Sequence, residues 1–307
     1  MATQSAIDTA KQIQVTKGGT GAATFTDHGV LVGSGTAAIT ALSVGATGTL
    51  LVGTVGSDPA FATTAVGDFT FTSSTANETR NFTLSNTDNT AAATSAARMN
   101  VSVGGTLVGD AQLNWVVTGQ TTWANGVDNT NEGYKIAASA TLGTTDIFFS
   151  KVSTGEITKP LQPAFLAQIP TGGSVSNVTG DGTIYSYVCT SEIFDQNADY
   201  NTGTGQFTAP VSGRYFLVAG VRLSGVVAAS AEQCTVYINT SNRRYRNGEN
   251  RGSHLADFEE IVCATVADMD ASDVAYPQVQ ASGGTKIVAV FGFTDPVITC
   301  FAGYLAC

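Results

Sequence analysis

The chain has 307 residues and a net charge of −10, and only 12% of its residues are charged, against roughly 25% in ordinary globular domains. The length allows two or three domains with cores of their own. The negative charge argues against nucleic-acid binding, which needs clustered Lys and Arg. No run of about 18 apolar residues predicts membrane insertion, and the polar stretch after Met1 predicts no signal peptide.

The first predicted domain, residues 1–66, contains an imperfect repeat. Val30–Gly33 recurs as Leu50–Gly53, and Ile39–Val44 between them alternates apolar and small residues. Short runs of this kind, separated by glycines, predict brief strands joined by tight turns. One copy buries too little apolar surface to offset its ordering entropy. The repeat therefore predicts stacking or winding around sister chains.

Residues 67–165 form the second predicted domain, a β-rich shaft. Its alternating segments predict strands at Asp68–Thr72, Asn81–Ser85, Met99–Val103, Leu113–Thr118 and Asp146–Lys151. Both tryptophans, Trp115 and Trp123, lie here. We expect them in a core or in packing between chains, with a sugar-stacking platform as the alternative. Pro160 and Pro163 predict a linker at the end of the shaft.

The third predicted domain, residues 166–307, has the strongest strand patterns. They lie at Phe207–Leu223, Cys234–Asn239, Val274–Gln280, Lys286–Phe293 and Phe301–Cys307. Eight to ten strands in about 140 residues predict a sandwich or a jelly roll. No segment shows a helical stripe with caps, so the fold class predicted for the whole chain is all-β.

All five cysteines lie in the last domain: Cys189, Cys234, Cys263, Cys300 and Cys307. None has the spacing of a zinc site, and the chain has only two histidines. We therefore expect reduced, buried thiols, no metal and no cofactor.

Polysaccharide cleavage by a pair of carboxylates is the main enzymatic alternative. Its candidates are Glu259, Glu260, Asp268, Asp270 and Asp273. In a strand, the adjacent glutamates would point to opposite faces. The aspartates occupy a predicted turn with weak potential for calcium, and solvated loop acids are the favoured interpretation of all five.

Hydrolysis by a serine triad needs a histidine near a nucleophile. His28 lies in the repeat and His254 in a polar loop, and neither accompanies a nucleophile-elbow pattern. Gly18–Gly21 does not follow a strand and open a helix, so it is not a phosphate loop. The chain is therefore predicted not to be an enzyme.

One basic cluster stands out in the last domain. It consists of Arg243, Arg244, Tyr245, Arg246 and Arg251. The arginine forks suit phosphate or carboxylate groups of surface glycans, and the tyrosine ring suits stacking on a sugar. We predict a receptor-binding loop here, with a solvated hairpin or an intersubunit salt bridge as the alternative.

The segment Y-N-T-G-T-G-Q-F-T-A-P-V-S-G-R-Y-F-L-V from Tyr200 resembles the complement globular-head jelly roll, one of the tumour-necrosis-factor-like trimeric folds. Asp195 lies in the matching lead-in, and Phe301–Leu305 is similar to the closing F-x-G-x-L strand. Met269–Val274 resembles a turn of that family, with Ser272 where glycine is usual. This resemblance implies a trimeric head.

The first domain resembles a module of phage tail fibres. The match is carried by K-G-G-T-G-A-A-T-F-T-D-H-G-V-L-V-G-S-G-T from Lys17, and Ser85–Thr90, Gly126–Asn129 and Thr154–Ala167 resemble shaft segments that follow it. Together the resemblances imply an elongated homotrimeric fibre in the virion. Its N-terminal region would attach to other tail or baseplate proteins, and its jelly-roll head would bind a glycan or protein on the host surface. A structural baseplate or capsid decoration protein is the first alternative, followed by a depolymerase spike and a secreted complement-type protein.

Overall fold

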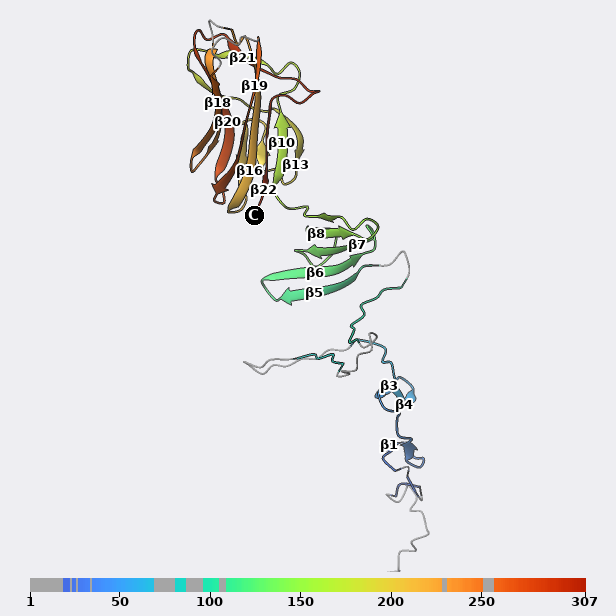
Figure 1. The fold of residues 1–307 in the computed structure, drawn as a ribbon. Coiled ribbons are helices and arrows are strands. Elements are labelled where there is room, and N and C mark those ends of the chain that lie inside the picture. Colours follow the sequence, from blue (N-terminus) through green and yellow to red (C-terminus); the bar gives the residue numbers. More distant parts are fainter. Residues whose placement is uncertain are drawn as a thin grey trace, which may run out of the picture. The chain divides into compact units, whose positions relative to one another are not determined.

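A computed structural model of the chain describes residues 19–22, 24–25, 27–33, 35–68, 81–86, 96–104, 109–227, 231–250 and 257–307. Its regular structure in these residues consists of strands, which confirms the predicted all-β class. The chain divides into two compact units, Met1–Thr83 and Leu84–Cys307 (Figure 1). The domain limits predicted after residues 66 and 165 remain predictions. No helix in the described residues is long and apolar enough to span a membrane.

The first unit consists of two small hairpins. β1 (Val30–Val32) pairs with β2 (Thr40–Leu42), and β3 (Leu50–Thr54) pairs with β4 (Ser57–Ala62). The repeat predicted β1, β2 and β3, whereas β4 was not predicted. None of the described residues of this unit belongs to the buried hydrophobic core, which leaves the hairpins without the apolar burial that two-stranded structures need.

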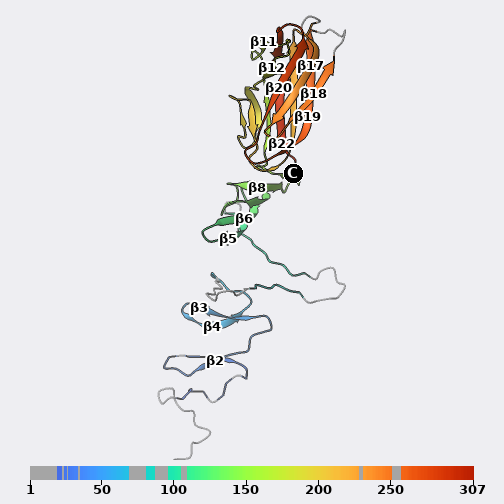
Figure 2. The ribbon, with the colours of Figure 1, turned by 90° about the vertical axis from the view of Figure 1, so that its left-hand side faces the viewer.

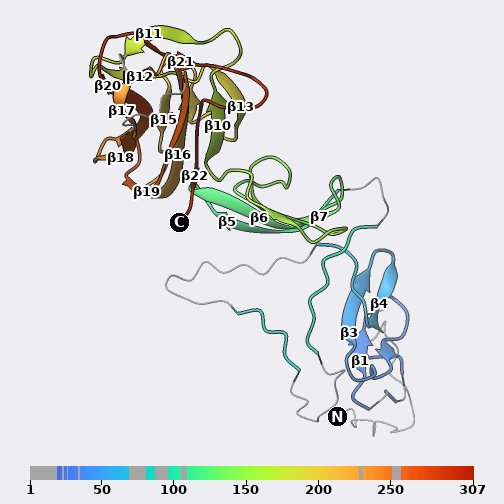
Figure 3. The ribbon, with the colours of Figure 1, turned by 45° about the horizontal axis from the view of Figure 1, so that its top comes forward.

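A single five-stranded sheet follows in the second unit, with β5, β6 and β7 side by side in Figure 3. Its strands are consecutive and antiparallel: β5 (Ala111–Val117), β6 (Thr121–Asp128), β7 (Gly133–Ala137), β8 (Asp146–Lys151) and β9 (Ile157–Thr158). The β5–β6 register places Trp115 directly opposite Trp123. The two tryptophans are therefore a cross-strand pair on one face of the sheet.

The head is a sandwich of two sheets, whose long strands face each other in Figures 1 and 2. The seven-stranded sheet has the order β11 (Val175–Thr179), β21 (Val288–Phe291), β16 (Gly213–Ser224), β22 (Cys300–Leu305), β10 (Ala164–Gln168) and β13 (Ser191–Asp195), with β19 (Phe258–Met269) paired to β16. The six-stranded sheet has the order β14 (Tyr200–Asn201), β15 (Gln206–Thr208), β20 (Val274–Gly283), β17 (Ala231–Thr240) and β18 (Arg244–Asn250), with β12 (Ile184–Ser186) paired to β20.

The path of the chain between these sheets is that of a jelly roll. After β15 in the six-stranded sheet the chain crosses to β16, returns for β17 and β18, crosses again to β19 and returns for β20. The last two strands, β21 and β22, complete the seven-stranded sheet, where β22 lies between β10 and β16. The predicted jelly roll is confirmed, with 13 strands in place of the expected eight to ten.

Aromatic rings fill the space between the two sheets of the head. The Phe165 ring stacks on Phe207 at 4.7 Å and on Tyr200 at 5.1 Å, and meets the edge of Phe301 at 5.1 Å. Phe207 is also 5.4 Å from Tyr215. All five rings are buried. Contacts of this kind add to the burial of large apolar surfaces and make this cluster the centre of the head's stability.

Two predicted strands and part of the cysteine prediction are wrong. Residues 81–86 and 96–104 are irregular, since no strand pairs with them, although Asn81–Ser85 and Met99–Val103 alternate in sequence. Asp68–Thr72 lies largely outside the described residues. All five cysteines are free, but Cys300 is half-buried and Cys307 is exposed, while Cys189, Cys234 and Cys263 are buried as predicted. Burial raises the pKa of the Cys263 thiol.

Replacing Phe165 by Ala is expected to lower the free energy of unfolding of the head by about 3–5 kcal/mol, because a cavity opens where four rings meet. Ile287→Ala, at a residue that is half-exposed, is the control and should change it by about 0.5 kcal/mol or less. Urea denaturation followed by tyrosine fluorescence or circular dichroism measures both. Equal effects of the two substitutions would contradict this description of the core.

Candidate functional site

The predicted receptor-binding residues lie at the β17–β18 hairpin. Arg243 is in the turn, while Arg244, Tyr245 and Arg246 belong to β18. The sequence interpretation placed them in a loop, so their position in a strand is a correction. It follows from the pairing of Asn239 through Gln233 on β17 with residues 244 through 250. The fifth predicted residue, Arg251, lies outside the described residues.

Two of the arginines hold contacts within the head. The Arg243 guanidinium donates to Asp268 at 2.7 Å, and a backbone hydrogen bond together with this arginine lowers the pKa of Asp268. Arg244 Nε donates to Asn239 Oδ1 at 2.6 Å, and its guanidinium lies 5.1 Å from the centre of the Tyr237 ring. The guanidinium groups of Arg243 and Arg244 therefore form intramolecular contacts, and only part of their hydrogen-bonding capacity is left for a ligand.

The remaining two hairpin residues, Tyr245 and Arg246, differ in whether their side chains make contacts within the head. The Tyr245 hydroxyl donates to Asp268 at 3.4 Å, and the ring packs against the core of the head. Burial and the Asp268 carboxylate raise the pKa of Tyr245. Arg246 is exposed, and its side chain has no ion-pair or hydrogen-bond partner among the described residues. It is therefore the arginine of the cluster that is best placed to meet a ligand.

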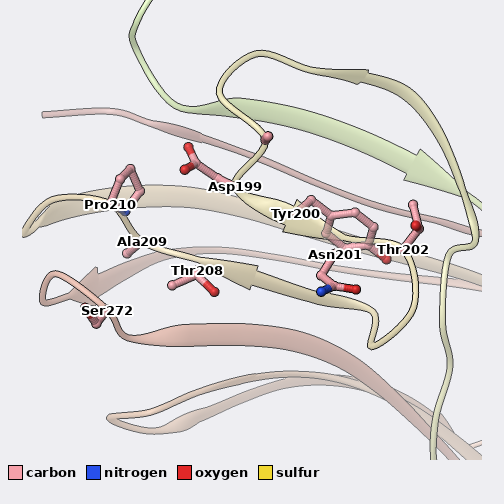
Figure 4. A pocket seen from close by; sticks show the side chains of 9 residues that line it. Asp199, Tyr200, Asn201, Thr202, Thr208, Ala209, Pro210 and Ser272 are labelled. Atoms are coloured by element: carbon pink, nitrogen blue, oxygen red, sulfur yellow. The ribbon is translucent and has the colours of Figure 1, made fainter.

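A polar pocket of about 540 Å³ lies at another place on the head (Figure 4). It is formed by two segments around the β14–β15 hairpin and by the turn between β19 and β20. Its lining residues are Ala198, Asp199, Tyr200, Asn201, Thr202, Thr208, Ala209, Pro210 and Ser272. The walls thus offer one carboxylate, one amide and several hydroxyl groups, which suit a ligand rich in hydroxyl groups.

The lining residue Asp199 and its neighbour Asp195 are the two carboxylates at this pocket. Asp195 accepts the backbone N–H groups of Asp199 at 3.2 Å and Tyr200 at 2.8 Å. Asp199 Oδ2 is buried and has no hydrogen-bond partner. Burial, and then the charge of Asp195, raise the pKa of Asp199. An unpaired buried carboxylate oxygen is costly when ionised, so Asp199 is a strained group in the folded head.

The turn that carries Ser272 shows why glycine is usual in the family it resembles. Ser272 has a φ of 77°, in the left-handed region that glycine adopts without steric cost. Its N–H donates to Ala209 at 2.7 Å, which ties the turn to the opposite wall of the pocket. Asp273 accepts hydrogen bonds from the Asp270 backbone at 2.9 Å and from Asn242 at 3.0 Å. The carboxylate of Asp273 is thus engaged with the protein itself.

The two adjacent glutamates among the candidate acids for sugar cleavage lie on opposite faces of one strand. Glu259 and Glu260 are adjacent on β19, with Glu259 buried and Glu260 exposed, as expected for alternate faces of a strand. The interpretation of Glu259 as a solvated loop acid is therefore wrong, since it lies in a strand that packs on the core. Glu260 and Asp268 also belong to β19 and not to a loop or turn. Glu260 is 3.6 Å from Arg222. His28 lies in the first unit beside Asp27, and His254 is outside the described residues.

The described residues include no group of three or more His, Cys, Asp or Glu that could hold a metal ion. What the basic cluster and the pocket offer is hydrogen bonding to a polar ligand. Sequence reasoning missed the pocket, although Asn201 and Ser272 were both noted as positions of the family resemblance.

Comparison with known proteins finds no matching family model and no matching curated protein. Similar solved structures include the globular domain of zebrafish complement 1qA protein, at 15% identity and a TM-score of 0.33, covering 48% of this chain and 98% of that one. Murine APRIL at pH 5.0 is similar at 13% identity and a TM-score of 0.34, covering 47% and 98%. The likeness is one of fold.

Asp199→Asn is expected to stabilise the head at pH 7 by about 1 kcal/mol or less, because it removes a carboxylate whose ionisation is unfavourable in the folded state. The folded-state pKa is raised, so the penalty is absent below the ordinary value of 3.8 and grows as the pH rises through the folded-state value. Thermal unfolding at pH 3 and pH 7 measures the difference. Asp195→Asn, which weakens acceptors of two backbone N–H groups, should destabilise the head at pH 7 instead.

Proposed function

We propose that the chain is a structural subunit of a bacteriophage tail fibre, which assembles as a homotrimer through its head and attaches to a molecule on the host surface. It would reside in the virion and have no catalytic activity. The tail-fibre part of this proposal is supported by the sequence from Lys17 to Leu42 and by the two hairpins that this region and its continuation form.

The observation that carries the proposal is the outward face of the seven-stranded sheet. Pairing places the same face of β16, β19 and β22 side by side, with Phe216 opposite both Val266 and Tyr304. Most of the large side chains on this face are apolar: Leu166, Phe194, Phe216, Val218, Phe258, Val262, Ala264, Val266, Phe291, Ala302 and Tyr304. The same register also places two oppositely charged cross-strand pairs here, Arg214 opposite Asp268 and Arg222 opposite Glu260. Val262 and Val266 are 53% and 57% exposed.

Exposed apolar side chains gathered on one face of a sheet favour an interface. Soluble monomers rarely expose contiguous apolar patches larger than a few hundred Å², and larger ones mark interfaces. Across β16, β19 and β22, the Phe216 and Tyr304 rings lie 5.4 Å apart and form a rigid aromatic centre. Covering this face with further copies of the head would bury it at little cost in ordering, since the strands are already fixed.

Three heads on one tip would also supply avidity to a weak receptor site. Binding of one head makes the second binding event intramolecular, so several weak polar sites act together. The exposed Arg246 and the polar pocket of Figure 4 are the places that such a ligand would meet. A structural baseplate or decoration protein would have the same interface between copies but no need of either place.

The double substitution Val262→Asp, Val266→Asp is expected to convert trimers to monomers, because buried unpaired carboxylates are costly. Native mass spectrometry measures the assembly. Val211→Asp is the control, at a residue that is 47% exposed but lies outside β16, β19 and β22. A wild-type chain that is monomeric, or a double variant that remains trimeric, would contradict the proposal.

Arg246→Ala is expected to reduce adsorption of particles to host cells severalfold while trimers and the melting temperature stay unchanged, since this exposed side chain has no hydrogen bond or ion pair among the described residues. Arg243→Ala should lower the melting temperature as well, because it leaves Asp268 without its ion pair. Adsorption rates of particles carrying each variant measure the effect. Normal adsorption of the Arg246 variant would show that the hairpin is not the receptor site, and it would favour the purely structural alternative.

A further inference from the structure

The five-stranded sheet β5–β9 has one covered face and one bare face. The segment between β7 and β8 covers one of them, where Gln112 and Asn114 donate to the Ala140 carbonyl at 2.8 and 3.2 Å. The side chains buried on this covered face include Ala124 and Ala137. The side chains on the other face are exposed or half-exposed, so no described residue outside the sheet covers that face.

The covered face holds little apolar surface. Its hydrophobic cluster consists of Ala124, Ala137 and Leu142. Beside it lies a buried ionic group, in which Lys135 Nζ is 2.8 Å from carboxylate oxygens of both Asp128 and Asp146. The half-buried ring of Phe149 also lies on this face, beside Lys135. Buried ion pairs add little net stability, and these few apolar side chains do not offset the ordering entropy of about 50 residues. The sheet therefore needs a second apolar contact.

The bare face offers this contact. The strand register places one row of apolar side chains on it: Leu113, Trp115, Val117, Trp123, Val127, Tyr134, Ile136, Phe148 and Ile157. Trp115 is 63% exposed and Val117 is 59% exposed. None of the residues that the register places on this face is charged, since the others are Ala111, Thr121, Asn125 and Ser150.

The polar atoms in the middle of this face are already paired with one another. Trp115 Nε1 donates to Asn125 Oδ1 at 2.7 Å, and Asn125 Nδ2 donates to Tyr134 OH at 2.9 Å. A solvated surface does not require such pairing. A surface that loses its water does, because buried polar groups without partners cost free energy. The indole of Trp115, the amide of Asn125 and the phenol of Tyr134 would thus keep these hydrogen bonds when another surface displaces the water from this face.

We infer that a second copy of this chain covers the bare face, so that residues 111–158 form an interface between subunits in addition to that of the head; this rests on the proposed trimer. The segment between Thr158 and Ala164 is short, and it is held to the head by Gln196, which donates to the Lys159 and Pro160 carbonyls at 2.8 and 2.9 Å. Copies joined at their heads would therefore keep their sheets at high effective concentration.

The same face fits a polysaccharide less well. Sugar sites present polar groups that converge on the ligand, but here the amide of Asn125 is engaged on both its atoms. The aliphatic side chains of Val117 and Val127 flank the tryptophans and offer no hydrogen bonds. An uncharged and largely apolar face is instead complementary to a copy of itself.

The tryptophans make the test selective, because both tryptophans of the chain lie on this face. In the wild-type assembly, we expect their fluorescence to be blue-shifted and protected from acrylamide quenching compared with the urea-unfolded chain. Val117→Lys should remove this protection. Val116→Lys is the matched control, since Val116 is the next residue of the same strand, is 62% exposed and lies on the opposite face.

Protection must also depend on the second copy. In the chain with Val262→Asp and Val266→Asp, which separates the heads, we expect quenching to increase toward that of the unfolded chain. Protection that persists in this monomer would mean that the chain covers its own face and would overturn the inference. So would tryptophans that are freely quenched in the wild-type assembly, or quenched until a glycan is added.

Native mass spectrometry of the same samples distinguishes failure of the interface at residues 111–158 from failure of the proposed head trimer. A wild-type trimer with freely quenched tryptophans refutes the second interface and leaves the proposed head trimer intact. A wild-type chain that is dimeric, with tryptophans protected until Val117→Lys is introduced, refutes the trimer and supports the interface at residues 111–158.

Discussion

A β-strand directs successive side chains to opposite faces. Each face of a sheet in this chain must therefore either pack against other apolar groups or contact water. In the head, the two sheets cover each other on their inner faces, and the rings around Phe165 fill the space between them. The outer face of the seven-stranded sheet nevertheless carries exposed Val and Phe side chains, and one face of the β5–β9 sheet is largely apolar. The low proportion of charged residues has its structural meaning here. Much of the exposed surface on these two faces consists of Val, Phe, Tyr and Trp.

The strands of the head were largely predictable because their apolar alternation is local. Cys234–Asn239 lies within β17 and Val274–Gln280 within β20. Asn81–Ser85 and Met99–Val103 alternate equally well, yet no strand pairs with them. Strand formation depends on a partner that is distant in sequence, and local pattern contains no information about whether that partner exists. The same limit explains why the number of head strands was underestimated, since several are only two or three residues long.

The candidate site was predictable in composition but not in geometry. The basic cluster was visible in sequence, whereas Asp268, which neutralises Arg243, is 25 residues away and is brought near by folding. The pocket is assembled from three separate segments, and its strained Ser272 shows itself only through its φ angle. The interior position of Glu259 likewise follows from which face of β19 meets the core. Each of these features depends on the register of the strands, because a one-residue shift would move every side chain of a strand to the opposite face of its sheet.

The central position of β22 affects the order in which the head forms. This strand joins β10 to β16, yet more than 130 residues separate it from β10 along the chain. Until Cys300–Leu305 is available, β10 lacks its neighbour on that side, and the seven-stranded sheet is in two parts. Contacts this distant in sequence close slowly, because a long loop must be ordered first. A nascent head would thus expose its inner apolar surfaces until late, and chaperone assistance during this interval would reduce aggregation.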